Sequence, residues 1–196
     1  MLVIRLSFAN NPKITYRLAK SSGLNIGLFT TVNPDDGTRT LPTYATARKT
    51  ETGSPRKSVL VAHILATLTA HETVQDEDMA LPKDWNTTTP DTTQGLGHKQ
   101  GTRTVALHSL SVLPELQGSR VGSTLLRSFI QMVKDSKVVD RVALITFERL
   151  VPWYERFGFE NLGKSNAQYA GEEWYDMVSG YHPTVPSHES LIKPGP

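Results

Sequence analysis

The clearest alternation of hydrophobic and polar positions lies in the second half of the chain. Residues 102–112 alternate like a strand, a turn follows, and the next segment carries apolar residues at helical spacing, namely Leu125, Leu126, Phe129, Ile130 and Val133. One helix and three strands follow in the order strand, short helix, strand, strand, over residues 138–147, 151–157, 159–165 and 174–181. The pattern predicts a domain that mixes strands and helices.

The first half of the chain holds fewer regular elements. A short helix is predicted over residues 12–20, because Pro12 suits its first turn and follows two asparagines that can cap it. Strands are predicted over 24–32 and 59–68. We expect the remaining polar segments to form a long loop and a long surface excursion, over 33–57 and 72–100.

Composition limits the class of protein. The 196 residues, 38% hydrophobic and 20% charged, suit one folded α/β domain and differ from a disordered chain. The absence of cysteine excludes disulfides, thiolate metal sites and a cysteine nucleophile, and we predict no metal site. No apolar run reaches the roughly 18 residues of a membrane span, and Met1 to Phe8 is too short for a signal peptide. We therefore expect a soluble, cytoplasmic protein that does not bind membranes.

Charge is balanced overall but unevenly distributed. The 21 basic and 19 acidic side chains give a formal net charge of +2, which is no reason to expect nucleic-acid binding. Residues 61–100 are the acidic part, where Glu72, Asp76, Glu77 and Asp78 fall within seven positions. This acidic stretch either attracts a cationic ligand or is a solvated surface loop.

The turn after the strand at 102–112 is a candidate phosphate site. It reads Gln117-Gly118-Ser119-Arg120-Val121-Gly122 and leads into a helix. A turn of this kind leaves backbone N–H groups open at the helix N-terminus, where the helix dipole favours a phosphate, although many such turns bind nothing. About thirty residues on, an aromatic helix reads Val151-Pro152-Trp153-Tyr154-Glu155-Arg156-Phe157-Gly158-Phe159-Glu160.

The turn and the aromatic helix, at this separation, resemble the GNAT superfamily of N-acetyltransferases. The segments His108-Ser109-Leu110-Ser111-Val112-Leu113-Pro114-Glu115 and Trp174-Tyr175-Asp176-Met177-Val178 resemble its arylalkylamine (serotonin) N-acetyltransferase-like branch, especially fungal members with polyamine or arylalkylamine substrates. The resemblance covers about Thr15 to Tyr181. It implies an α/β (α+β) GNAT fold, with a mixed, mostly antiparallel sheet that is flanked by helices and splayed between the strands at 102–112 and 139–147.

The same resemblance sets the expected domain limits. A single GNAT domain is expected over residues 1–181, followed by a loose tail over 182–196. Relatives begin with a further strand and helix, for which Met1 to Phe8 is a shortened substitute. Because that region helps to wall the amine pocket in the family, acceptor binding is the part of the site that depends most on it.

The resemblance also implies the substrate acetyl-CoA and the residues that hold it. The strand end is expected to pair with the pantetheine arm, and the N–H groups of the turn to hold the pyrophosphate. The expected binding residues are Leu110, Ser111, Val112, Gln117, Gly118, Ser119, Arg120, Val121, Gly122 and Ser123. Arg120 stands where the family has glycine, so its side chain either crowds the phosphates or pairs with one.

Acetyl transfer to an amine needs a base, because only the unprotonated amine can attack the thioester. An amine with a pKa near 10.4 is unprotonated in about one molecule in 10³ at pH 7. His108 matches the histidine of the family motif and suits that role, whereas Tyr154 matches its general acid and suits protonation of the leaving thiolate. The alternatives are a hydrogen-bonded strand histidine and a core tyrosine. Members of the family often have a second histidine two residues earlier, and this position is Ala106 here, which leaves His108 as the only nearby imidazole. His63 is expected to be a packing residue.

The leading hypothesis is an acetyl-CoA-dependent N-acetyltransferase that acetylates a small primary amine by direct attack in a ternary complex, since no cysteine can form an acyl-enzyme. The acidic stretch and the aromatic residues suit an arylalkylamine or a polyamine. Two alternatives stay open. One is a CoA-binding module with little turnover, which Arg120, Ala106 and the short start favour; the other is a protein lysine or N-terminal acetyltransferase. The sequence predicts no oligomeric state.

Overall fold

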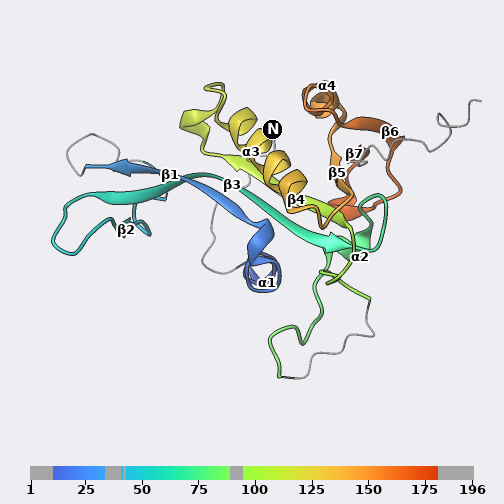
Figure 1. Ribbon diagram of the computed structural model, residues 1–196, viewed down its shortest axis with the longest axis horizontal. Coiled ribbons are helices and arrows are strands. Elements are labelled where there is room, and N and C mark those ends of the chain that lie inside the picture. The colour runs from blue at the N-terminus through green and yellow to red at the C-terminus, as the bar shows by residue number, and fades with distance from the viewer. Residues whose placement is uncertain (1–10, 34–40, 42, 89–94, 181–196) are drawn as a thin grey trace, which may run out of the picture.

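The computed structural model describes residues 11–33, 41, 43–88 and 95–180, which form one open sheet with helices on both faces (Figure 1). The strands are β1 (Ile26–Val32), β2 (Arg48–Lys49), β3 (Lys57–Thr69), β4 (Thr104–Val112), β5 (Arg141–Thr146), β6 (Glu160–Lys164) and β7 (Tyr175–Gly180). The α-helices are α1 (Pro12–Lys20), α2 (Asp76–Met79), α3 (Val121–Ser136) and α4 (Val151–Glu155).

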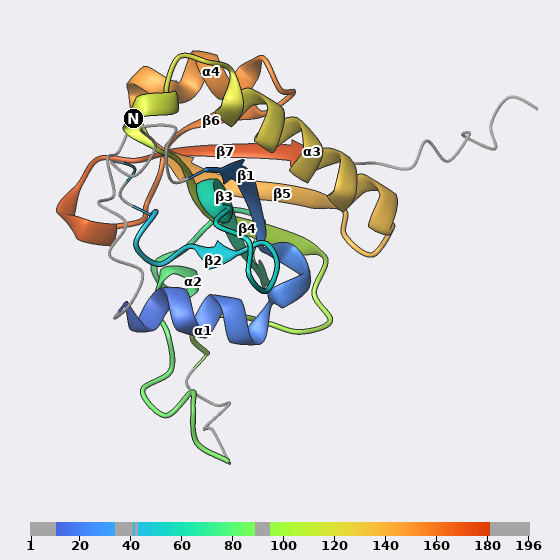
Figure 2. The ribbon, with the colours of Figure 1, turned by 90° about the vertical axis from the view of Figure 1, so that its left-hand side faces the viewer.

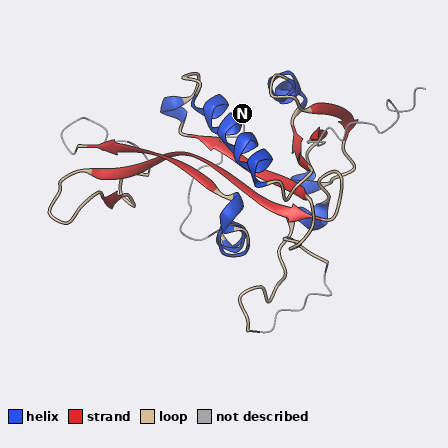
Figure 3. Cartoon of the chain, in the orientation of Figure 1, coloured by secondary structure: helices blue, strands red, loops and turns tan. Residues whose placement is uncertain are grey.

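The sheet has the strand order β1-β3-β4-β5-β7-β6, with β2 pairing the start of β3. Neighbouring strands are antiparallel except β4 and β5, which run parallel. The β4–β5 ladder joins Thr104–Ala106 to Arg141–Ala143 and stops there, so the two strands separate towards their C-terminal ends. This confirms the expected mixed, mostly antiparallel sheet and its splay. Figure 3 shows the paired parts of β1, β2 and β3 projecting from the body of the molecule.

Helix α1 lies on one face of the sheet, and α3 and α4 lie on the other (Figures 1 and 2). Helix α1 begins where predicted, because the Asn11 side chain accepts hydrogen bonds from the N–H groups of Lys13 and Ile14 at 3.0 and 3.4 Å. The apolar stripe of α3 is buried against core residues of β3 and β4, and Leu126 and Phe129 are fully covered. Capping signals therefore predicted α1, and hydrophobic periodicity predicted α3.

Two short elements lie inside segments that we expected to be irregular. Strand β2 lies within the predicted loop at 33–57, and α2 lies within the predicted excursion at 72–100. Both β2 residues are exposed and pair with Lys57 and Ser58, so they leave no hydrophobic alternation to detect. Helix α2 has four residues, little more than one helical turn, which is too short for a periodic pattern.

Some predictions fall outside the described residues. These are the tail at 182–196, the shortened start at Met1 to Phe8 and most of the turn after residue 33. Within the described part of the chain, no helix combines the length and the apolar character that crossing a bilayer would require.

Candidate active site

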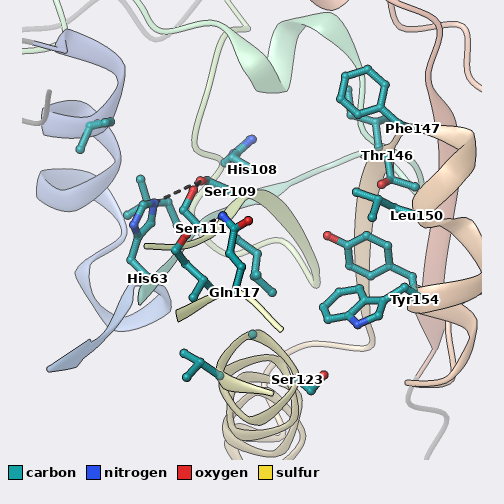
Figure 4. A pocket seen from close by; sticks show the side chains of 18 of the residues that line it. His63, His108, Ser109, Ser111, Gln117, Ser123, Thr146, Phe147, Leu150 and Tyr154 are labelled. Atoms are coloured by element: carbon teal, nitrogen blue, oxygen red, sulfur yellow. Dashed lines mark hydrogen bonds between the residues drawn. The ribbon is translucent and has the colours of Figure 1, made fainter. Parts of the chain in front are cut away.

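A cavity of about 440 Å³ opens where β4 and β5 separate (Figure 4). Its lining comes from α1, β3, β4, the start of α3, the end of β5, α4 and the segment before β7. The cavity brings together nearly all predicted site residues, namely His108, Leu110, Ser111, Val112, Gln117, Gly118, Arg120, Val121, Gly122, Ser123 and Tyr154. Ser119 does not line it; the Ser119 hydroxyl donates instead to the carbonyl of Leu116.

A β-bulge in β4 sets which side chains reach each side of the sheet. The register between β3 and β4 shifts opposite His108, which is the extra residue of the bulge. Leu107 and Leu110 pack with the core beneath α3. His108 and Ser109 instead contact residues on the α1 side of the sheet. The bulge therefore places two consecutive polar side chains on one face of the cavity.

His108 is held at both ring nitrogens. Its Nε2 lies 2.7 Å from the hydroxyl of Thr67 on β3, and its Nδ1 lies 3.2 Å from the sulfur of Met79 on α2. Burial lowers the pKa of His108 well below its usual value, and the positive charges of Arg17 and Lys13 lower it further. The imidazole is therefore neutral at pH 7. In the tautomer that carries its proton on Nε2 and donates it to the Thr67 hydroxyl, Nδ1 keeps its lone pair beside the thioether and can accept a proton.

A second imidazole, His63, also lines the cavity, so the prediction that His108 is the only nearby imidazole is wrong. His63 Nε2 lies 3.1 Å from the hydroxyl of Ser109, which lies 3.4 Å from that of Ser111. Burial lowers the pKa of His63 to about 4. The alternation of side chains along β3 could have predicted this position. The buried core residue Ile64 points to the α3 side, so its neighbour His63 points to the opposite face.

Tyr154 approaches from the opposite wall. Its ring packs edge-on against Trp153 and Phe159, with centroid separations of 4.8 and 5.6 Å, and the residue is 8% exposed. Figure 4 shows the phenol oxygen directed into the cavity. Burial raises the pKa of Tyr154, so the hydroxyl keeps its proton at neutral pH. Tyr154 is therefore both part of the core and a proton donor facing the cavity.

The turn before α3 presents backbone donors to the cavity. The N–H groups of Val121, Gly122 and Ser123 belong to the first turn of α3, where no helical carbonyl precedes them. Gly118 and Arg120 both adopt left-handed backbone angles, with φ of 81° and 66°. Arg120 is the N-cap of α3, so a residue with a side chain occupies a conformation that favours glycine.

The exposed edge of β4 offers further backbone groups. The N–H of Leu113 donates to the carbonyl of Val61 at 2.9 Å. The backbone groups of every second residue of β4, counted back from Leu113, therefore point towards β3. Because the ladder uses alternate residues, the backbone groups of Leu110 and Val112 face the opening instead. The Val112 carbonyl there accepts a hydrogen bond from the Gln117 side chain at 3.1 Å. An extended ligand can pair with this edge.

The comparisons with known proteins agree with this architecture. A model described as an acetyltransferase (GNAT) domain matches residues 69–179, more than half of the chain. The chain belongs to the GNAT acetyltransferase family. Serotonin N-acetyltransferase of Mesocricetus auratus is 31% identical over 104 residues, which are 53% of this GNAT chain and 42% of that protein. The chain therefore spans less than half the length of this curated relative.

Solved structures similar to this GNAT chain include two bound to coenzyme A species. The GphF GNAT-like decarboxylase in complex with isobutyryl-CoA is 11% identical, with a TM-score of 0.48 over 63% of this chain and 74% of that chain. The PaiA N-acetyltransferase of Thermoplasma acidophilum in complex with coenzyme A is 14% identical, with a TM-score of 0.39 over 63% of this chain and 55% of that chain.

The acidic stretch at 72–78 does not line the cavity of this GNAT domain. Glu72 pairs with Arg141 at 2.9 Å, and Asp76 accepts from the N–H of Gln168 at 3.0 Å. The carboxylate of Asp78 is buried and accepts hydrogen bonds from His71 and from the N–H of Gln75. These carboxylates hold α2 and its neighbours together, so the stretch gives no support for a cationic ligand.

Proposed function

We propose that this GNAT domain is an acetyl-CoA-dependent N-acetyltransferase that acetylates a small primary amine by direct attack in a ternary complex. The observation that carries the proposal is the opening between β4 and β5. His108 and Tyr154 border it from opposite walls, and the first turn of α3 lies at one end. Membership of the GNAT family supports acetyl transfer in particular.

Acetyl-CoA binding would use the backbone more than the side chains. The pantetheine arm would pair with the free edge of β4 at Leu110 and Val112 in the manner of an added strand. Its pyrophosphate would then reach the N–H groups at the start of α3, where the helix dipole favours negative charge. Arg120 lines the same part of the cavity, so its guanidinium is available to a phosphate.

The transfer step forms a C–N bond and breaks the C–S bond of acetyl-CoA. The attacking amine must lose a proton, and the departing thiolate must gain one. In our proposal the neutral imidazole of His108 takes the first proton, directly or through water. The Tyr154 hydroxyl gives the second to the thiolate, whose conjugate acid has a pKa near 8.5. No acyl-enzyme is needed.

The amine side of the cavity is rich in aromatic groups. Phe147 and Trp174 stack with ring centroids 4.6 Å apart, and both line the cavity together with Trp153 and Tyr169. These rings favour an acceptor with an aromatic or other apolar part, in keeping with the name of the Mesocricetus auratus relative, serotonin N-acetyltransferase. A polyamine is less suited, because no carboxylate of the described residues lines the cavity.

The alternative is a CoA-binding module with little turnover. The observation in its favour is Arg120, which places a side chain where the family turn has glycine, in a left-handed conformation that favours glycine. A panel of primary amines with acetyl-CoA, followed by thiol release and mass detection of the N-acetyl product, separates the two. Turnover above the uncatalysed rate on at least one amine supports an enzyme. CoA binding without turnover on any amine supports the module.

A further inference from the structure

Helix α1 brings two cations to the cavity, on the opposite face of the sheet from α3 (Figure 2). Lys13 and Arg17 are four residues apart, so both lie on the same side of α1. Arg17 is 7% exposed, which is rare for arginine unless a partner neutralises its charge. The two residues thus form a basic subsite at the amine end of the cavity.

The guanidinium of Arg17 has no carboxylate partner among the described residues. Its Nη2 donates to the carbonyl of Met79 at a long 3.5 Å, although a guanidinium carries five N–H donors. Burial lowers the pKa of Arg17 to about 10, so the group remains charged at neutral pH. A buried charge without a counterion is costly, and binding an anion would remove that cost.

Lys13 adds a second positive charge beside the first. Its Nζ lies 4.7 Å from the centroid of the Tyr169 ring, which also lines the cavity. Like charges at this helical spacing repel each other, and an anion bound between them would reverse the effect. The phosphates of acetyl-CoA do not serve here, because the turn proposed to hold them lies with α3 on the other face of the sheet.

We propose that the acceptor amine also carries a carboxylate, which Arg17 and Lys13 hold beside His108. The inference rests on the proposed function and narrows its substrate to amino acid-like amines. A planar guanidinium matches a carboxylate in a bidentate geometry, and a lysine supplies a further point charge. The reaction would convert the amino carboxylate and acetyl-CoA to the N-acetyl amino carboxylate, CoA and one proton.

Three acceptors that differ at one group test this inference on the full chain. Phenylalanine carries the carboxylate, phenylalaninamide replaces it with an uncharged group of similar shape, and phenethylamine lacks it. We expect kcat/KM per free amine to be at least about tenfold higher for phenylalanine than for either analogue. The variant Arg17→Gln should raise the KM for phenylalanine about tenfold or more and leave the KM values for phenethylamine and acetyl-CoA unchanged.

Two further variants keep the test decisive if Arg17→Gln folds poorly. Lys13→Gln, at a half-buried position, should produce a smaller loss confined to phenylalanine, and Arg17→Lys should restore part of the preference. Lys20→Gln removes an exposed charge from the same helix and should change nothing. The inference is overturned if phenylalaninamide and phenethylamine, which lack the carboxylate, are turned over as well as or better than phenylalanine, and if Arg17→Gln affects all three acceptors equally. That result leaves the proposed function standing. Absence of turnover on every amine overturns both.

Discussion

The hydroxyl of Thr67 lies 2.7 Å from Nε2 of His108, across the bulged ladder between β3 and β4. Thr67 is 1% exposed, so this contact is shielded from bulk water. It fixes the orientation of the imidazole and leaves Nδ1 beside the cavity-lining sulfur of Met79. The base of the proposed reaction is thus positioned by a neighbouring strand.

Replacement of this base should change the pH profile. In His108→Gln we expect the largest loss of kcat at low pH and partial recovery as pH rises, because solvent then supplies more free amine. Thr67→Val removes the positioning hydroxyl alone. It should reduce kcat severalfold and leave the shape of the pH profile as in the wild type. Thr104→Val, at another buried threonine that does not line the cavity, is the control. A His108→Gln profile parallel to wild type would place proton transfer elsewhere.

Stability should decline in mildly acidic solution because buried histidines resist protonation. The folded pKa of His63 is about 4, below the unfolded value near 6.5. Between these values the unfolded chain binds a proton that the folded chain does not, so the free energy of unfolding falls as pH falls. The expected slope is about 1.4 kcal/mol per pH unit for each such histidine. His98 and His108 shift in the same direction.

Urea denaturation at pH 7, 6 and 5 measures this slope. The variant His63→Gln should show a shallower decline than wild type, even if its stability at pH 7 is lower. Equal slopes for the two proteins would mean that His63 titrates normally in the folded state.

Backbone strain at both ends of α3 should be removable. Arg120 and Lys137 adopt φ of 66° and 55°, in the left-handed region that disfavours residues with a Cβ. We expect Arg120→Gly and Lys137→Gly each to raise the free energy of unfolding by about 0.5–1 kcal/mol. Ser128→Gly, in the exposed middle of α3, should lower it by roughly 0.5 kcal/mol. Chemical denaturation would contradict this account if all three glycine variants were destabilised alike.

Coenzyme binding should depend on the size of residue 122. A Cβ at Gly122 would meet Val112 at 3.4 Å and Leu110 at 3.6 Å, which are ordinary contacts. Saturating CoA should therefore raise the melting temperature of wild type and Gly122→Ala alike, and Gly122→Leu should lose the shift. An unrelated nucleotide is the control ligand. A shift with that nucleotide and none with CoA would show that the turn does not recognise CoA.

Local pattern predicted the centre of this molecule and missed its long-range contacts. The hydrophobic alternation of 102–112 predicted β4, and the apolar stripe that begins at Leu125 predicted α3, without reference to any known family. The splay came from the resemblance, because no hydrophobic pattern records where two parallel strands stop pairing. The basic subsite was missed because Arg17 meets Met79 across 62 positions of sequence. A helix surface of nine residues does not indicate whether an arginine faces water or a cavity.

The steady-state kinetics of Tyr154→Phe test the central claim most directly. The substitution removes a hydroxyl and leaves the ring that packs against Trp153 and Phe159. With thiol release as the assay, the account predicts that kcat falls about 10²–10⁴-fold while the KM for acetyl-CoA changes less than about twofold. A variant that retains nearly full kcat would contradict it, because the proton that the thiolate needs would then come from another group.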